Sequence, residues 1–289
     1  MSIPRPETIA VGNATVGYYT YGAPDGAPVV VFHGTPACGA GFAWADGPAA
    51  SRGLRLIAPD RPGVGLSSRT ESLTVASYAA MVESFADALG LDSFAVWGYS
   101  GGGPYAVAAA ALLPERVTAA AIAAGMGQIP EWAGVDEFEK TDRQFLMMAT
   151  RRPRLARTLI GSVGRLARLS PASAMRSFVK QLSAADRAVI DTLGAPRDVM
   201  ALFTQAFLGG AAGVVDDYAA LAQPWGIDLS MIVCPVLVAH GTADQMVPLA
   251  HSVALADRVA TATLVTWPDE GHLATVTHVG EILDALRSR

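Results

Sequence analysis

The stretch Phe94-Ala95-Val96-Trp97-Gly98-Tyr99-Ser100-Gly101-Gly102 decides the fold of this 289-residue chain. A short apolar run leads into a glycine-rich turn with Ser100 at its tip, and an alanine-rich run over 104–113 follows. A strand, a sharp turn and a helix in this order present a serine hydroxyl as a nucleophile. The flanking glycines let strand and helix approach each other, and Gly101 leaves an unobstructed N–H beside the serine. Because G-x-S-x-G also occurs in ordinary glycine loops, the prediction depends on finding the other catalytic groups.

Composition excludes several classes of protein. The net charge of −5 argues against a nucleic-acid-binding protein, which usually carries a basic face. Two cysteines, Cys38 and Cys234, are too few for a disulfide framework or a metal cage, and both are expected to be small buried residues. The chain has no H-E-x-x-H, paired C-x-x-C or G-x-x-x-x-G-K motif, so we predict neither a metal nor another cofactor.

The longest uncharged run raises the question of a membrane span. It extends over 93–114, but Gly101-Gly102-Gly103-Pro104 divides it, so a strand and a helix are the better interpretation. The first ten residues contain proline and acidic breaks and lack an apolar segment typical of a secretory signal. We therefore expect a soluble cytoplasmic protein without stable membrane insertion.

Short apolar runs alternate with turns and helices through most of the chain. Strands are predicted at 15–21, 28–32, 54–58, 94–97, 117–124, 235–239 and 264–267. A helix is predicted between these strands, with Thr74 as N-cap and Gly90 at its end. Strands that are apolar on both faces and alternate with helices indicate an α/β fold, with a mostly parallel twisted sheet flanked by helices.

The middle of the chain has a different pattern. Between 128 and 225 no convincing strand occurs, and helical periodicity covers 137–148, 183–193 and 198–208. We interpret residues 128–225 as an inserted helical cap, with residues 1–127 and 226–289 forming the core.

A serine nucleophile needs a base, and His272 is the preferred candidate among five histidines. It follows the last predicted strand, so its loop can reach over the edge of the sheet toward the serine. His33 and His240 each precede a glycine at a strand end and are expected to hold loop backbone. His251 and His278 lie in predicted helices, where a surface or packing role is expected.

The base in turn needs an orienting acid, and Asp244 is the candidate. It directly follows the strand at 235–239, and an open parallel sheet collects its active site at the carboxyl ends of its strands. The strand at 117–124 is followed by Gly125 and Met126 and offers no carboxylate. Asp228 precedes its strand, and the acids at 269 and 270 share the histidine loop.

A tetrahedral intermediate needs two N–H donors for its oxyanion. Gly101 offers one directly after the serine. The turn His33-Gly34-Thr35-Pro36 offers the second, and Thr35 is the expected donor because Pro36 has no N–H.

With these motifs the chain resembles the α/β-hydrolase superfamily, in which a serine elbow, an acid and a histidine follow one another along the chain. Residues 60–67, Asp-Arg-Pro-Gly-Val-Gly-Leu-Ser, resemble the D-x-x-G-x-G-x-S loop of that family, and the insertion takes the place of its cap. The resemblance implies acyl transfer by Ser100, Asp244 and His272. A serine at the elbow disfavours the epoxide hydrolases and haloalkane dehalogenases of this fold, which carry an aspartate nucleophile.

Substrate specificity is expected between cap and core. The candidate pocket residues are Trp132, Phe138, Phe145, Met147, Met148, Phe203 and Phe207, for which packing within the cap is the alternative. Residues 151–168 contain six arginines and no acid. A solvated face of the cap is the expected role of this segment, with membrane-surface contact or recognition of an anionic group as alternatives.

Three hypotheses for function follow. The first is a serine hydrolase that cleaves a small to medium, largely apolar ester, thioester or lactone through an acyl-enzyme. The second is a C–C bond hydrolase or a perhydrolase with the same triad, and the third is a non-catalytic ligand-binding protein. The expected partner is a small-molecule substrate, and the sequence makes no prediction of oligomeric state.

Overall fold

An eight-stranded sheet forms the centre of the computed structural model, which describes residues 5–128, 138 and 140–287. The strand order is β1-β2-β4-β3-β5-β6-β7-β8, with β1 and β2 antiparallel to their neighbours and the others parallel. The strands are β1 (Glu7–Val11), β2 (Ala14–Gly22), β3 (Ala27–Phe32), β4 (Leu54–Pro59), β5 (Phe94–Tyr99), β6 (Val117–Ala123), β7 (Val236–Gly241) and β8 (Ala262–Trp267). The predicted mostly parallel sheet is therefore confirmed.

The central strands are buried on both faces, because helices cover both sides of the sheet. Residues 29–32 of β3 are fully buried, as their unbroken apolar sequence predicts. The first strand, β1, was not predicted. It is an edge strand that is largely exposed, so it lacks the apolar pattern on which the prediction depended.

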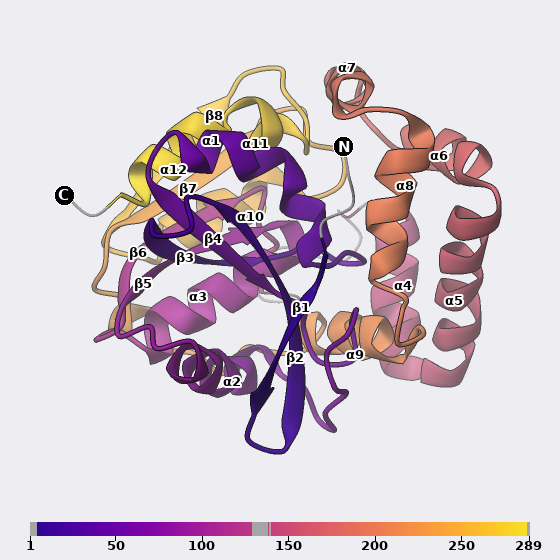
Figure 1. The fold of residues 1–289 in the computed structure, drawn as a ribbon. Coiled ribbons are helices and arrows are strands. Elements are labelled where there is room, and N and C mark those ends of the chain that lie inside the picture. The colour runs from indigo at the N-terminus through magenta and orange to yellow at the C-terminus, as the bar shows by residue number, and fades with distance from the viewer. Residues whose placement is uncertain (1–4, 129–137, 139, 288–289) are drawn as a thin grey trace.

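Helices of the core lie on the two faces of the sheet (Figure 1). The helices α1 (Asp46–Ala50) and α12 (Val279–Ala285) pack together on one face, and α2 (Val75–Ala88) and α3 (Gly103–Leu112) pack together on the other. Thr74 caps α2, as predicted, by accepting a hydrogen bond from the backbone of Ser77. In α3 the first nine residues are all buried, which explains why its sequence is almost entirely alanine and other apolar residues. Two further core helices are α10 (Leu249–Ala256) and α11 (Ala274–Thr277).

Among the residues that the structure describes between β6 and β7, six α-helices form a separate layer beside the core (Figure 1). They are α4 (Lys140–Arg151), α5 (Pro153–Leu169), α6 (Pro171–Val179), α7 (Ala184–Leu193), α8 (Pro196–Gln205) and α9 (Ala212–Leu221). The predicted helix at 198–208 begins two residues earlier, since Pro196 suits the first turn of a helix. Ser183 caps α7 by accepting a hydrogen bond from the backbone N–H of Asp186.

Helix α9 returns from this layer to the core. A Cβ added to Gly213 would lie 2.2 Å from the carbonyl carbon of Gly63, so α9 contacts the loop after β4 at backbone distance. This approach brings α9 side chains close to the loop that follows β4 at the carboxyl edge of the sheet.

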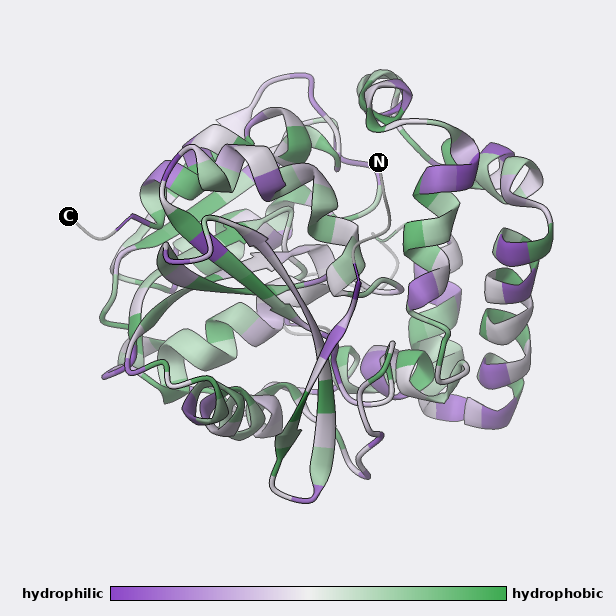
Figure 2. Ribbon diagram, viewed as in Figure 1, coloured by the Kyte–Doolittle hydropathy of each residue, from purple (hydrophilic) through white to green (hydrophobic). Residues whose placement is uncertain are grey.

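Figure 2 shows the apolar character of the strands and the mixed surface of α5. Within the described part of the chain, no helix combines the length and apolar character needed to cross a bilayer. Cys38 and Cys234 are both buried free thiols, as predicted.

Candidate active site

Ser100 lies at the sharp turn between β5 and α3, with a φ of +55°. Few residues other than glycine adopt this left-handed conformation, and such strain is typical of a functional turn. The flanking glycines are required by contact, because a Cβ on Gly98 would lie 2.6 Å from the backbone oxygen of Gly102. A Cβ on Gly102 would lie 2.0 Å from the backbone oxygen of Phe32. The packing of β5, β3 and α3 thus fixes where the serine hydroxyl is presented.

His272 and Asp244 come from loops after two neighbouring parallel strands, β8 and β7. The distance from His272 Nδ1 to Asp244 Oδ2 is 2.8 Å. The other oxygen of Asp244 accepts hydrogen bonds from the backbone N–H groups of Met246 and Val247, at 2.8 and 3.0 Å. These bonds fix the carboxylate so that it holds the imidazole ring in one orientation.

The buried Asp244–His272 pair shifts both pKa values in opposite directions. Burial raises the pKa of Asp244, but the charges and hydrogen bonds of His272 and His240 outweigh it and hold that pKa well below its ordinary value. Burial lowers the pKa of His272, but the charge and hydrogen bond of Asp244 outweigh it and raise that pKa above 6.5. The pair therefore stabilises a positively charged imidazole.

Ser100 and His272 line the same cavity, which has a volume of about 230 Å³. The ring of Tyr99 lies 5.1 Å from that of His272, centroid to centroid, and helps to hold the histidine over the end of the sheet. The three residues predicted as the triad are thus gathered at the carboxyl edge of the sheet.

Thr35 lies in the loop after β3, next to the serine turn. A Cβ on Gly101 would lie 3.1 Å from the backbone nitrogen of Thr35, and one on Gly34 would lie 3.3 Å from Ser100 Cβ. The two predicted oxyanion donors, the N–H groups of Thr35 and Gly101, are therefore neighbours beside the serine.

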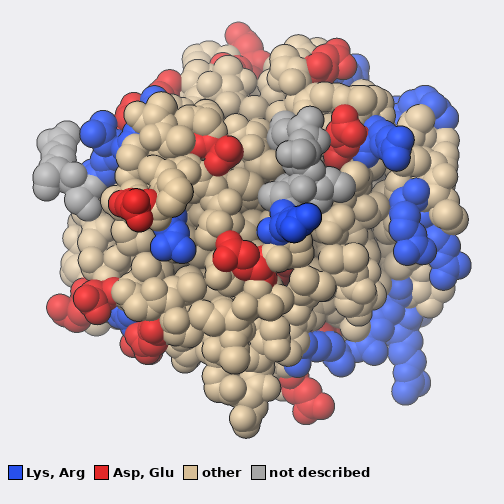
Figure 3. Space-filling model, in the orientation of Figure 1, with Lys and Arg blue, Asp and Glu red and all other residues tan. Residues whose placement is uncertain are grey.

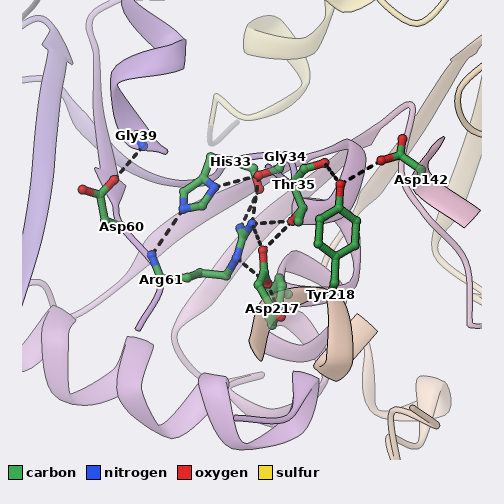
Figure 4. Close-up of polar contacts among 10 residues, drawn as sticks. His33, Gly34, Thr35, Gly39, Asp60, Arg61, Asp142, Asp217 and Tyr218 are labelled. Carbon is green, nitrogen blue, oxygen red and sulfur yellow. Dashed lines mark hydrogen bonds and ion pairs between the residues drawn. The ribbon is translucent and has the colours of Figure 1, made fainter. Parts of the chain in front are cut away.

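A fully buried arginine, Arg61, holds this loop from behind (Figure 4). Its guanidinium donates hydrogen bonds to the backbone oxygens of His33 and Gly34 and to Thr35 Oγ1. Asp217 of α9 supplies the counter-charge, with 2.7 Å between Arg61 Nη2 and Asp217 Oδ2. A buried guanidinium with a paired carboxylate and satisfied donors orients its partners rigidly.

The bond from Arg61 to Gly34 has a consequence for Thr35. The C=O of Gly34 and the N–H of Thr35 belong to one planar trans peptide unit and point in opposite directions. Arg61 Nη2 lies 2.9 Å from the oxygen of Gly34, so the N–H of Thr35 faces away from the arginine.

Tyr105 of α3 completes the network around Arg61 by donating a hydrogen bond to Asp217 Oδ1 at 2.6 Å. Sequence reasoning missed Arg61 and Asp217, which lie 156 residues apart.

A second buried carboxylate from the insertion, Asp186 of α7, contacts the histidine loop. Its Oδ1 accepts a hydrogen bond from the backbone N–H of Leu273 at 2.6 Å, and its Oδ2 accepts one from Ser183 Oγ at 2.8 Å. The sequence marks Asp186 only as part of a helix N-terminus, so this link was not predicted.

The other four histidines have local roles. His33 accepts a hydrogen bond from the backbone N–H of Arg61 at 3.2 Å, and His240 contacts the backbone oxygen of Val247 at 3.0 Å, so both hold loop backbone as expected. His240 also lies 3.1 Å from Asp244 Oδ2. His251 of α10 is buried, and His278 contacts Glu270 and Glu281.

The residues predicted for the pocket are distributed unevenly. Phe203 lines the active-site cavity and a second cavity beside it, and Phe145 lines the second cavity. Phe138 packs on His251, and Phe207 packs on Gly164. Neither cavity includes Met147 or Met148 among its lining residues, and Trp132 lies outside the described residues. Residues that were not predicted line much of the active-site cavity: Trp44, Phe178, Ile190, Leu193, Val199, Met200, Leu202, Met246 and Val276.

The arginines of the 151–168 segment lie on the outer face of the insertion (Figure 3). All six are exposed, while Ala156, Ile160, Gly164 and Ala167 form the buried side of α5. Of the described residues that line the two cavities, none is arginine or lysine. The expected solvated face fits this placement, and recognition of an anionic group in these cavities does not.

The fold and the arrangement at the sheet edge define a class of protein. A model of the alpha/beta hydrolase fold family matches residues 27–279, and the chain belongs to that family. Hydrolysis is the class of activity that membership supports.

Similar proteins include hydrolases and a peroxidase. The non-heme chloroperoxidase of Streptomyces lividans is 28% identical over 283 residues, which cover 94% of each chain. The uncharacterized hydrolase YcgS of Bacillus subtilis (strain 168) is 26% identical over 271 residues, 93% of this chain and 92% of the relative. The crystal structure of the esterase RhEst1 from Rhodococcus sp. ECU1013 superposes with a TM-score of 0.67 at 21% identity, covering 99% and 100% of the two chains. That last likeness shows the fold alone.

Proposed function

We propose that the protein is a serine hydrolase that cleaves a small to medium, largely apolar ester, thioester or lactone. The observation that carries the proposal is the contact of 2.8 Å between Asp244 and His272, together with a cavity that both His272 and Ser100 line, the serine having a φ of +55°. An intact arrangement of this kind argues against a non-catalytic ligand-binding protein.

The mechanism follows from the geometry of the two loops. His272 takes the proton of Ser100 as the hydroxyl oxygen attacks the acyl carbonyl, and Asp244 stabilises the resulting imidazolium. The N–H groups of Thr35 and Gly101 bind the oxyanion, and the leaving group departs with the proton held by His272. Water then attacks the acyl-enzyme with the same histidine as base, which releases the acid and restores the serine. Each oxyanion donor contributes roughly 3–4 kcal/mol in comparable sites.

The lining of the cavity supports the substrate class. Apolar side chains from the insertion and the core, among them Trp44, Leu193, Leu202 and Met246, surround the serine and histidine. Such walls favour an apolar acyl or alcohol group. We infer that residues 128–225 act as a cap over residues 1–127 and 226–289, because α7 and α8 supply part of this lining.

A direct test is burst release of 4-nitrophenol from 4-nitrophenyl butyrate. The parent protein should show a burst, and Ser100→Ala should show none. A serine-directed fluorophosphonate should add its mass to a peptide containing Ser100. Ser230 is exposed and lies in the short 3-10 helix Leu229–Met231. Ser230→Ala is therefore a matched control that should keep the burst. Full activity of Ser100→Ala, or an adduct at another residue, would contradict the proposal.

A second candidate activity, perhydrolysis, is favoured by the similarity to a non-heme chloroperoxidase. Hydrogen peroxide would then replace water as the acceptor of the acyl group from Ser100 and release a peracid. Peracid formation from acetate and hydrogen peroxide, compared with ester hydrolysis in the same preparation, distinguishes the two activities.

A further inference from the structure

The active-site cavity continues into a second cavity of similar volume, about 230 Å³. The two cavities share five lining residues, including Pro36, Met200 and Phe203. We call the second cavity the side arm. A substrate bound at Ser100 therefore has room for a second group beyond the apolar region around the serine.

Aromatic side chains form part of the wall of the side arm. Phe145, Phe178, Phe203 and Tyr218 all line it. The rings of Phe145 and Tyr218 have centroids 5.7 Å apart and planes at 63°, so they form a corner. Faces of aromatic rings carry partial negative charge and attract cations within about 6 Å of the ring centre.

In addition to these aromatic rings, one charged side chain lines the side arm. Asp142 of α4 lies at its wall and accepts a hydrogen bond from Tyr218 Oη at 2.8 Å (Figure 4). This bond fixes the carboxylate beside the ring that it contacts. The charge of Asp142 reaches the catalytic region, where it contributes to raising the pKa of His272. Among the described residues that line either cavity, Asp142 is the single charged residue apart from the histidine itself.

From this combination we propose that the side arm binds an alkylammonium group of the substrate, an inference that rests on the proposed ester hydrolysis. A carboxylate gives the attraction for the positive charge, and the rings provide a surface that attracts a cation without strong hydration. The charge of the carboxylate also repels substrates that end in a carboxylate or phosphate.

Two pairs of esters test the proposal, because a trimethylammonium group and a tert-butyl group have nearly the same shape. The first pair is butyrylcholine and 3,3-dimethylbutyl butyrate. The second places the group on the acyl side, in 4-nitrophenyl esters of 4-(trimethylammonio)butanoate and 5,5-dimethylhexanoate. We expect kcat/KM to be about tenfold higher for the cationic member of at least one pair. Equal or lower values for the cationic member of both pairs would overturn the proposal.

Substitutions in the side arm test whether the cationic group of the substrate binds there. Asp142→Asn and Phe145→Leu should each lower the ratio of the two kcat/KM values toward one. The ratio within one variant is independent of general losses of folding or activity. Asp191→Asn, an exposed carboxylate of α7 that lines neither cavity, is the matched control and should keep the ratio. A preference that survives both Asp142→Asn and Phe145→Leu would show that the cation binds elsewhere.

Binding without catalysis separates this proposal from the proposed function. Calorimetry with the Ser100→Ala variant should show that choline binds more tightly than 3,3-dimethylbutan-1-ol, and that Asp142→Asn in the same background removes the difference. If neither ester of either pair is hydrolysed but choline binds in this way, ester hydrolysis is wrong and the ammonium site stands. If esters are hydrolysed and choline shows no advantage, the ammonium site is wrong.

Discussion

At the scale of single residues, the proposed mechanism makes the carboxylate of Asp244 set both the rate and its dependence on pH. In that mechanism His272 acts as a base only when neutral, and Asp244 raises the pKa of His272 above 6.5. Activity should therefore fall as the pH decreases through that raised pKa. Asp244→Asn should lower kcat by about 10⁴ and move the midpoint of this acid limb to lower pH, because the stabilising charge is lost. Profiles of kcat/KM against pH for both proteins check this. An unchanged midpoint in Asp244→Asn would mean that another group titrates.

The candidate site residues differ in whether the sequence around them marks them as functional. Ser100, Asp244 and His272 each follow a strand in a recognisable local pattern, so their positions at one sheet edge follow from topology. Asp142 lies in the amphipathic helix α4 and Asp217 in the apolar helix α9, and neither sequence marks its carboxylate as a site residue. The packing of α4 on α9, and of α9 on the loop after β4, turns these side chains toward the site.

At the scale of elements, helix α9 acts through Asp217 and Arg61 on the loop after β3, which carries the proposed oxyanion donor Thr35. Asp217→Asn keeps the shape but removes the charge that holds the guanidinium. We expect kcat to fall by about 10²-fold with little change in KM, because the N–H of Thr35 is needed chiefly in the transition state. Tyr105→Phe, which removes one hydrogen bond to Asp217, should have a smaller effect in the same direction. Steady-state kinetics with 4-nitrophenyl butyrate measure both.

The neighbour of Asp217 provides the control for this prediction. Asp216 lies on the same helix and pairs with the partly exposed Arg69, outside the network. Asp216→Asn should leave kcat and KM close to those of the parent protein, since exposed ion pairs contribute little. Equal losses of kcat from Asp216→Asn and Asp217→Asn would indicate that activity depends on the total charge of α9. The contact between Asp217 and Arg61 would then have no special role.

Elements also differ in how well the sequence predicted them. The buried strands and α2 have strong periodicity and were predicted within a few residues. The exposed edge strand β1 and helix α9 were missed, because the first pairs only with β2 and the second is mostly buried and lacks a polar face. Their positions depend on tertiary contacts that no local pattern encodes.

At the scale of the whole molecule, sequence pattern decides the layers, and long-range polar contacts decide how the insertion meets the core. The parallel sheet with helices on both faces follows from apolar runs alone. The contacts of Asp186 with Leu273 and of Asp217 with Arg61 join segments 87 and 156 residues apart. The first connects the insertion to the loop that carries His272, and the second connects it through Arg61 to the loop that carries Thr35, so the helices of the insertion help to build the site.

The stability of the whole molecule should depend on the charge of Asp60. This residue follows β4 and accepts a hydrogen bond from the backbone N–H of Gly39 at 2.8 Å. Burial raises the pKa of Asp60 from 3.8 to about 7, although that bond opposes the shift. Between these two values the folded protein keeps the proton that the unfolded chain releases. Unfolding therefore becomes more favourable as the pH rises, until the group ionises in the folded state as well.

This titration predicts a loss of at most about 4 kcal/mol in the free energy of unfolding as the pH rises from 3.8 to about 7. Asp60→Asn has no proton to lose and should remove that part of the pH dependence. Urea unfolding curves of both proteins at pH 5 and pH 8 sample part of this interval, so the parent protein should lose about 3 kcal/mol more than Asp60→Asn, because the contributions of all other groups cancel. Asp25→Asn changes an exposed carboxylate and should follow the parent curve. If Asp60→Asn and the parent protein lose the same free energy over this interval, Asp60 is already ionised in the folded state at pH 5, and another buried group must stabilise its charge.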